Sequence, residues 1–194
     1  QALTAAGASV GRATTGADIL DADLLVVPGV GAAAPAMDRL REGGFIAPVR
    51  AWIDADRPFL GICLGLQLLY EGSDEDGAET LGILPGRTVR LDGAPTLPHI
   101  GWNQVVRRRK HPAFEGIADD ADFYFVHSFV GQPDGPSADD LILAETDHGS
   151  RFASAVARGR LLGVQFHPER SGTNGLRLIA NVVGAARAAA PSRA

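Results

Sequence analysis

The chain has 194 residues, of which 45% are hydrophobic and 21% charged, and its formal net charge is −5. This length and composition predict one globular domain, residues 1–194, with a sizeable core. The acidic balance argues against a nucleic-acid surface, and no stretch is apolar and long enough to cross a bilayer. A single cysteine cannot form an internal disulfide, so we expect a reducing, cytoplasmic location.

The first residues suggest the end of a longer element. Residues 1–6 fit the last turns of a helix, with Gly7 as its C-terminal cap. In a sheet of alternating strands and helices such a helix follows a strand, so we expect the native polypeptide to extend upstream by a strand. Residues 10–13 are expected to form a short strand and residues 17–20 a helical turn.

The next strand ends in a glycine-containing loop. Residues 24–27 are apolar without a break, as in parallel strands covered on both faces. Residues 28–31, Pro-Gly-Val-Gly, then form either an ordinary turn or a closely approaching backbone that offers an N–H group to a ligand. Helical patterns follow at residues 35–42 and 45–54.

The only cysteine lies where an apolar strand gives way to a helical pattern. Residues 59–62 suit a buried strand, and leucines follow at helical spacing. Gly-Ile-Cys-Leu-Gly at residues 61–65 has the form of a nucleophile elbow, a strained turn between strand and helix. Such a turn would place the Cys63 sulfur at a helix N-terminus, where the N–H group of Leu64 can face a developing oxyanion. The alternative is that Cys63 is a small buried hydrophobe.

The middle of the chain contains short β-like segments. An acidic stretch at residues 71–77 is expected to be a solvated loop. The basic run at residues 107–110 is either a phosphate or nucleic-acid site or a solvated turn, and the acidic balance and missing aromatics favour the turn. Strands are expected at residues 88–91, 105–107, 123–126, 141–145 and 152–156.

The last expected strand, residues 161–166, leads into His167-Pro168-Glu169. If the backbone stays extended, His167 and Glu169 point to one face, where the carboxylate can orient the imidazole and free its other nitrogen to take a proton from a thiol. The alternative is a turn with two solvated polar residues. A helix over residues 174–187 closes the chain, with Leu176, Ile179 and Val183 as its apolar stripe.

The alternation of strands and helices predicts an α/β fold, in which ligands bind at the carboxyl ends of the strands. The loop at residues 28–31 and Cys63 both follow strands. They can therefore share one site.

The motifs at residues 61–67 (Gly-Ile-Cys-Leu-Gly-Leu-Gln) and 165–169 (Gln-Phe-His-Pro-Glu) resemble those of the class I glutamine amidotransferases. Residues 28–31, 97–103 (Leu-Pro-His-Ile-Gly-Trp-Asn) and 124–128 (Tyr-Phe-Val-His-Ser) are similar to the glutaminase subunit of imidazole glycerol phosphate synthase. The resemblance implies a flavodoxin-like α/β fold with a mostly parallel sheet, helices on both faces and a smaller antiparallel β portion.

The resemblance also implies roles for individual residues. Cys63 would be the nucleophile, His167 the general base and acid, and Glu169 the group that orients the histidine. The oxyanion hole would use Leu64 and a backbone N–H group from Gly29, Val30 or Gly31. Glutamine would be held by Gln67, Glu75, His127, Ser128 and Phe129. The partner would be contacted by Pro98, Trp102 and Asn103. No metal or cofactor is implied. The sequence departs from the family at Ala33 and Phe129, where Phe and Tyr are expected, and in lacking the family's first strand and its Gly-Asn-containing loop.

The activity so implied is hydrolysis of L-glutamine to glutamate and ammonia. The ammonia would pass to a cyclase subunit, a (β/α)₈ barrel that forms a heterodimer with this chain. That subunit makes imidazole glycerol phosphate and aminoimidazole carboxamide ribotide in histidine biosynthesis. Three alternatives stay open at this point: a class I glutaminase of another synthase, a free-standing cysteine hydrolase of γ-glutamyl compounds, and a non-enzymatic binding module.

Overall fold

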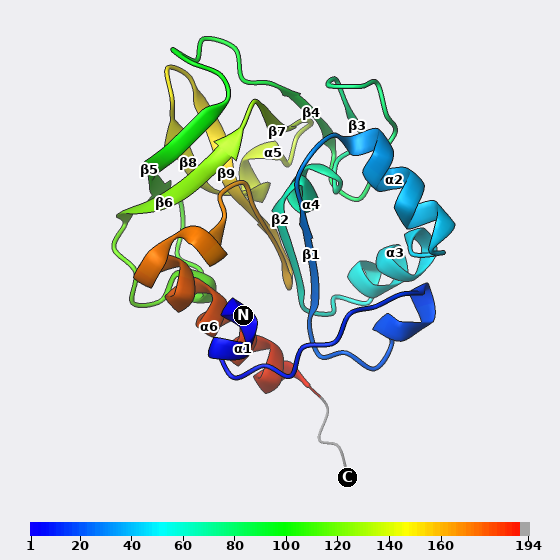
Figure 1. Ribbon diagram of the computed structural model, residues 1–194. Coiled ribbons are helices and arrows are strands. Elements are labelled where there is room, and N and C mark those ends of the chain that lie inside the picture. Colours follow the sequence, from blue (N-terminus) through cyan, green and yellow to red (C-terminus); the bar gives the residue numbers. More distant parts are fainter. Residues whose placement is uncertain (191–194) are drawn as a thin grey trace.

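The computed structural model describes residues 1–190, and strands of its main sheet separate two groups of helices (Figure 1). In chain order the elements are α1 Ala2–Ala5, η1 Gly16–Ile19, β1 Leu25–Gly29, α2 Ala33–Glu42, α3 Ile46–Asp54, β2 Phe59–Cys63, α4 Leu64–Gln67, β3 Gly72–Ser73, β4 Gly86–Arg90, β5 His99–Arg107, η2 Pro112–Phe114, β6 Asp120–His127, β7 Phe129–Pro133, α5 Ala138–Leu141, β8 Ile142–Asp147, β9 Arg151–Arg158, β10 Leu161–Val164, η3 Pro168–Arg170 and α6 Gly172–Ala189. None of these helices is both long and apolar enough to cross a membrane.

The main sheet has the strand order β1-β2-β10-β9-β8-β5-β6. Only β1, β2 and β10 run parallel to one another, and the pairs from β10 to β6 are antiparallel. The α/β architecture with a smaller second sheet is as predicted. The expectation of a mostly parallel main sheet was wrong, because β8 and β9 join as a hairpin through a short turn, and such connections make antiparallel pairs.

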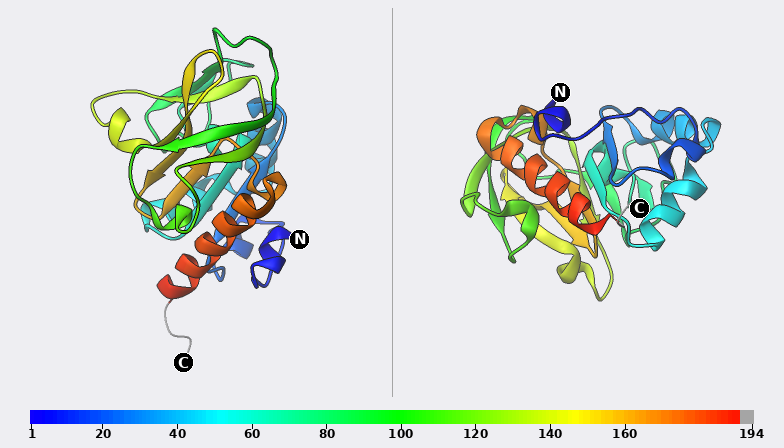
Figure 2. Two further views of the ribbon diagram at one scale, coloured as in Figure 1. Left: turned by 90° about the vertical axis from the view of Figure 1, so that its left-hand side faces the viewer. Right: turned by 90° about the horizontal axis from the view of Figure 1, so that it is seen from below.

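Two hydrophobic cores lie on the two faces of the sheet. Successive residues of a strand point to opposite faces, so Phe59 packs in one core while Leu60 and Ile62 pack in the other. The first core includes Met37 of α2 and Trp52 of α3, whereas the second includes Leu178 of α6. The right-hand view of Figure 2 shows the same division, with α6 and α1 on one side of the strands and α2 and α3 on the other.

The three-stranded second sheet has the order β3-β4-β7, and β4 and β7 are antiparallel. Two of its strands were not predicted. Residues 71–77 are not simply a solvated loop, since buried Gly72 and Ser73 pair with β4. β7 contains a glycine and ends in a proline, which weaken the strand pattern in the sequence.

The ends of the chain also differ in part from the predictions. Gly7, at φ +83°, ends α1 with the expected cap, because the N–H groups of Gly7 and Ala8 donate to the carbonyls of Thr4 and Leu3. Residues 10–13 form no strand, and exposed Val10 lies in an irregular segment. In α6 the stripe was placed wrongly at one position, because Leu176 is exposed and Leu178 is buried with Ile179 and Val183.

The turn at Cys63 depends on its glycines. A Cβ atom on Gly65 would lie 1.7 Å from the Val27 carbonyl oxygen, and one on Gly61 would lie 2.7 Å from the Gly65 oxygen. Both contacts are with backbone, which cannot move aside as a flexible side chain does. Close packing of the helix start against β1 and β2 therefore requires both glycines.

We expect Gly65→Ala to destabilise the fold by about 3 kcal/mol or more, because the clash must displace β1 or α4. Urea unfolding followed by circular dichroism measures this change. The matched control is Gly184→Ala, since Gly184 lies in α6 and an added Cβ would meet no atom within 4 Å beyond its chain neighbours and the backbone of its own helix. That variant should gain about 0.5–1 kcal/mol from the better helix former. A Gly65→Ala protein as stable as Gly184→Ala would contradict the packing argument.

Candidate active site

Cys63 occupies a strained backbone position at the end of β2. Its φ is +52° and its ψ −107°, which a residue with a side chain rarely adopts. The side chain is buried, and α4 begins at the next residue, Leu64. This conformation is the predicted elbow. The helix is shorter than expected, however, because α4 is a single turn ending at Gln67, so its dipole is weak.

The glycine-containing loop lies directly beside the cysteine. Gly29, the last residue of β1, is paired in register with Cys63, and a Cβ on Gly29 would approach the Leu64 side chain to 3.1 Å. Val30 is 74% exposed, and Gly31 has a φ of +94°. Parallel pairing thus brings this backbone to the same edge of the sheet as the elbow, as the sequence predicted.

His167 and Glu169 form a hydrogen-bonded pair of 2.8 Å between Nδ1 and Oε1. The pairing was predicted, but for a wrong reason. The backbone is not extended past His167: Pro168 begins the turn η3, which carries Glu169 back to the imidazole. The main chain of His167 is fixed by a 2.8 Å bond from its N–H to the Tyr124 carbonyl. Nε2 is buried and has no hydrogen-bond partner among residues 1–190.

The two side chains shift each other's ionisation. Burial lowers the pKa of His167, but its neighbours Cys63 and Glu169 outweigh burial and raise that pKa to about 9. Burial raises the pKa of Glu169, but its hydrogen bonds, first the one from His167, and the positive charges of His167 and Arg170 together outweigh burial and lower that pKa. Because the folded pKa of His167 exceeds its usual 6.5, protonation of His167 stabilises the fold fully below pH 6.5, and this contribution is lost as pH rises through 9. The lowered pKa of Glu169 has the opposite sign, so the contribution of its carboxylate is present above pH 4.5 and is lost as pH falls through the folded pKa.

A hollow of about 240 Å³ opens beside Cys63. It is lined by two of the three predicted loop residues, Val30 and Gly31, and by all five residues predicted to hold the substrate. Its lining is Val30, Gly31, Cys63, Gln67, Glu75, Pro98, Val126, His127, Ser128 and Phe129. Burial, and next the charge of Asp76, raise the pKa of Glu75. The size and mixed polar lining suit a small polar molecule.

One site residue was missed in the sequence. Gln165 is completely buried, and its Nε2 lies 3.5 Å from the Cys63 sulfur, to which it donates. Its Oε1 accepts from Nε2 of Gln67 at 3.2 Å, and Gln67 Nε2 also donates to the Phe129 carbonyl at 2.8 Å. The sequence feature that could have identified Gln165 is its position at the end of an apolar strand, two residues before the histidine. A polar side chain buried there needs hydrogen-bond partners.

The three residues predicted at a partner interface lie in different surroundings. Trp102 is 57% exposed on β5, so it is not a core tryptophan, and Ile100 and Val106 are exposed on the same strand. Pro98 lines the hollow at Cys63. The Asn103 side chain instead bonds to His99 and to the Asp147 carbonyl.

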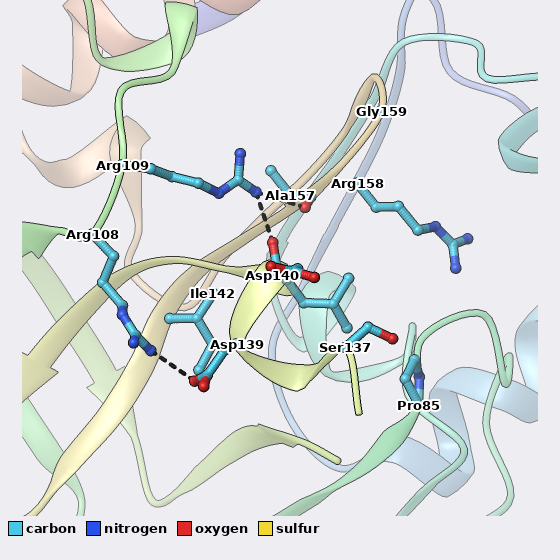
Figure 3. Close-up of a pocket in the computed structure, with 11 residues that line it drawn as sticks. Pro85, Arg108, Arg109, Ser137, Asp139, Asp140, Ile142, Ala157, Arg158 and Gly159 are labelled. Atoms are coloured by element: carbon cyan, nitrogen blue, oxygen red, sulfur yellow. Dashed lines mark hydrogen bonds and ion pairs between the residues drawn. The ribbon is translucent and has the colours of Figure 1, made fainter. Parts of the chain in front are cut away.

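A larger hollow, about 750 Å³, lies at the other end of the strands (Figure 3). Its lining includes Gly159, which lies in the turn before β10. Leu161, the first residue of β10, pairs with Phe59, the first residue of β2, so this turn lies at the amino ends of the two strands. Arg108 is paired there with Asp139 at 3.1 Å, and Arg109 donates to the carbonyls of Asp140 and Ala157. The expectation of a solvated turn at residues 107–110 holds only in part, because Arg107 ends β5 and pairs with Asp119, and only residues 108–110 lie outside the strand. Arg108 and Arg109 are engaged rather than merely solvated. The one hydroxyl in its lining, that of Ser137, has no histidine beside it in the lining to act as a base, so the site at Cys63 is the better candidate.

Comparison with known proteins connects this site to one family. The family model "Glutamine amidotransferase class-I" matches residues 8–185. The chain is 46% identical over 185 residues to "Imidazole glycerol phosphate synthase subunit HisH" of Synechococcus elongatus, which covers 93% of this chain and 84% of that protein. It is 49% identical over 164 residues to the protein of the same name from Nitrosococcus oceani, covering 82% and 77%.

Solved structures share the fold at lower identity. A structure described as glutamine amidotransferase superposes on this chain with a TM-score of 0.74 at 20% identity. The superposition covers 96% of this chain and 90% of the other chain. The glutaminase domain of Trypanosoma brucei CTPS with bound acivicin gives 0.63 at 20% identity, covering 89% and 74%.

Proposed function

Because the chain belongs to the class I glutamine amidotransferases, and within them to the family of imidazole glycerol phosphate synthase subunit HisH, we propose that Cys63, His167 and Glu169 are its catalytic triad. The protein is the glutaminase subunit of that synthase in histidine biosynthesis. The observation that carries the triad is the 2.8 Å bond between His167 and Glu169, which leaves a buried, unpartnered Nε2 on the side of Cys63.

The reaction begins when the Cys63 sulfur, as thiolate, attacks the side-chain amide carbon of glutamine. The carbonyl oxygen becomes an oxyanion, which the N–H of Leu64 and one from Gly29–Gly31 stabilise. His167, holding the proton from the thiol, passes it to the departing ammonia. Water, deprotonated by the same imidazole, then hydrolyses the glutamyl thioester to glutamate and the free thiol. Glu169 stabilises the imidazolium in both steps.

The substrate would lie in the hollow beside Cys63. Both N–H bonds of the Gln67 amide are used by Phe129 and Gln165, so its oxygen is the group left to accept from glutamine. Glu75 and the backbone of His127, Ser128 and Phe129 complete the lining. A reducing compartment such as the cytoplasm suits this role, since Cys63 must remain a free thiol.

We further propose a heterodimer with a (β/α)₈ barrel cyclase that receives the ammonia. The exposed Trp102, Ile100 and Val106 on β5 give this chain an apolar strip suited to such a contact. Similarity to HisH proteins over most of the chain argues against a glutaminase of another synthase, and the paired His167 and Glu169 argue against a non-enzymatic module. Activity on γ-glutamyl peptides without a partner would instead favour the free-standing hydrolase.

Adding the cyclase with its nucleotide ligand should raise glutamine hydrolysis by about 10²–10³-fold, the usual effect of one oxyanion donor. The reason is that Val30 lies exposed between two glycines, so its peptide can reorient when a partner covers it. Glutamate release is measured for the subunit alone, with cyclase, and with cyclase plus nucleotide. A subunit that turns over equally fast in all three mixtures would contradict the proposal.

A further inference from the structure

Three of the five histidines gather behind the glutamine pocket, and the mechanism above uses none of their side chains. His99 on β5 and His127 on β6 are buried. Nδ1 of His99 lies 3.1 Å from Nε2 of His127. His99 stacks on His148 at a centroid distance of 3.9 Å and on Phe125 at 4.9 Å. The rings are therefore held in place from several sides.

The orientation of Asn103 sets the direction of the hydrogen bonds in this cluster. Its Oδ1 accepts from the backbone N–H of Gln104 at 2.8 Å, and its Nδ2 donates to the Asp147 carbonyl at 2.9 Å. An N–H group can only donate and a carbonyl can only accept, so the amide cannot be turned the other way. The same Nδ2 lies 3.2 Å from Nε2 of His99 and must donate to it.

The tautomers of both histidines follow from this direction. With Nε2 of His99 accepting, its Nδ1 carries the proton and donates to Nε2 of His127. Nδ1 of His127 then donates to the Phe129 carbonyl at 3.1 Å, which can only accept. Both rings are neutral in this arrangement. A further proton on either ring would set two N–H groups against each other.

The cluster continues into the proposed active site. The Phe129 carbonyl also accepts from Gln67, which donates in addition to Gln165, and Gln165 donates to the Cys63 sulfur. An unbroken series of hydrogen bonds thus joins Asn103, the neighbour of exposed Trp102, to the nucleophile.

We propose that His99 and His127, as neutral Nδ1–H tautomers, are positioning residues that hold the Phe129 carbonyl and Gln67 in the geometry that binds glutamine. The inference rests on the proposed function, because it assigns the role to that substrate. Neither ring touches the reacting atoms.

The surroundings keep both rings neutral. Burial, and next the charge of His99, lower the pKa of His127 to about 3, and burial and the charge of His148 lower the pKa of His99 to about 4. The ionisable groups that act on His127 are His99, His148 and His167, all of which repel a proton. Since the unfolded chain takes up these protons near pH 6.5, the network loses stability as pH falls below that value.

The test compares His127→Ala with His127→Asn in the assembled synthase. The alanine removes the donor to the Phe129 carbonyl, and we expect the KM for glutamine to rise roughly tenfold, as for one lost buried hydrogen bond, with a smaller change in kcat. Asparagine places an amide N–H near the position of Nδ1, so the KM of His127→Asn should lie close to that of the unmodified protein. His111→Asn is the control, because His111 only caps η2 through its bond from Ala113 N–H.

Ammonia-dependent synthesis, which needs no glutamine pocket, reports whether each variant folds and assembles. If His127→Ala fails to assemble, His99→Gln replaces it, since glutamine stays polar but cannot donate from the position of Nδ1, and the same KM rise is expected. An unchanged KM in the assembled variant, or equal KM values for alanine and asparagine at position 127, would overturn the inference. Failure of the proposed function is recognised separately, by glutamine hydrolysis that survives Cys63→Ala.

Discussion

Cys63→Ala is expected to lower the rate of glutamine hydrolysis by on the order of 10⁶-fold, as nucleophile removal does in comparable triads. The side chain is the only thiol in the sequence, lies on the strained elbow and lines the hollow that we propose holds glutamine. Synthesis from added ammonium salt by the assembled synthase should be unchanged, because the cyclase requires only the nitrogen. Both rates are measured on one preparation.

Alanine retains the Cβ of Cys63, so the backbone at φ +52° should be preserved, and circular dichroism checks this. Loss of the ammonium-dependent rate together with the glutamine-dependent one would mean that Cys63 is structural. In that case it would be the small buried hydrophobe that the sequence alone also allowed.

His167→Ala should cost nearly as much as loss of the cysteine, whereas Glu169→Gln should cost roughly ten- to a hundredfold less. In the proposed mechanism the imidazole carries the proton in both steps, while the carboxylate acts on it through the 2.8 Å bond. Steady-state glutaminase kinetics of the two variants, with Glu115→Gln as a control for an exposed acid, measure the difference. Small and equal losses in the two variants would show that the three residues do not act as a triad.

The elbow was readable from the sequence because its determinants are local. An apolar run, one cysteine and glycines two residues to either side specify a tight turn, and the structure leaves no room for a Cβ atom at Gly61 or Gly65. The loop at Gly29 was placed correctly for a similar reason. Parallel strands align their carboxyl ends, and Gly29 pairs with Cys63.

The pairing of His167 with Glu169 shows how a right result can follow from a wrong geometry. Period-two alternation predicted that the two side chains share a face, yet a turn that begins at Pro168 brings them together. Proline has no N–H group and a fixed φ, so it favours the first position of such a turn. The spacing of the two residues correctly predicted that they pair, but the extended backbone assumed between them was wrong.

The parallel pairing of β10 with β2 and the buried network could not be predicted, because both depend on contacts between residues far apart in the sequence. Strand β10 lies between β2 and β9. Its pairing with β9 is a local hairpin, whereas its parallel pairing joins Leu161 to Phe59, far away in the sequence. Likewise Gln165 meets Cys63 across 102 positions, and His99 meets His127 across 28. Sequence patterns indicate which residues are buried, but not which buried polar groups become partners.

The most direct test of the central claim is the mass of the protein after reaction with an alkylating chloroketone analogue of glutamine. We predict addition of one analogue per chain, located on the peptide that contains Cys63, slowed by excess glutamine, and proceeding in step with loss of glutamine-dependent synthesis. Since the sequence has a single cysteine, the assignment is unambiguous. Labelling that glutamine does not slow, or complete loss of glutamine-dependent synthesis with Cys63 unmodified, would contradict the account.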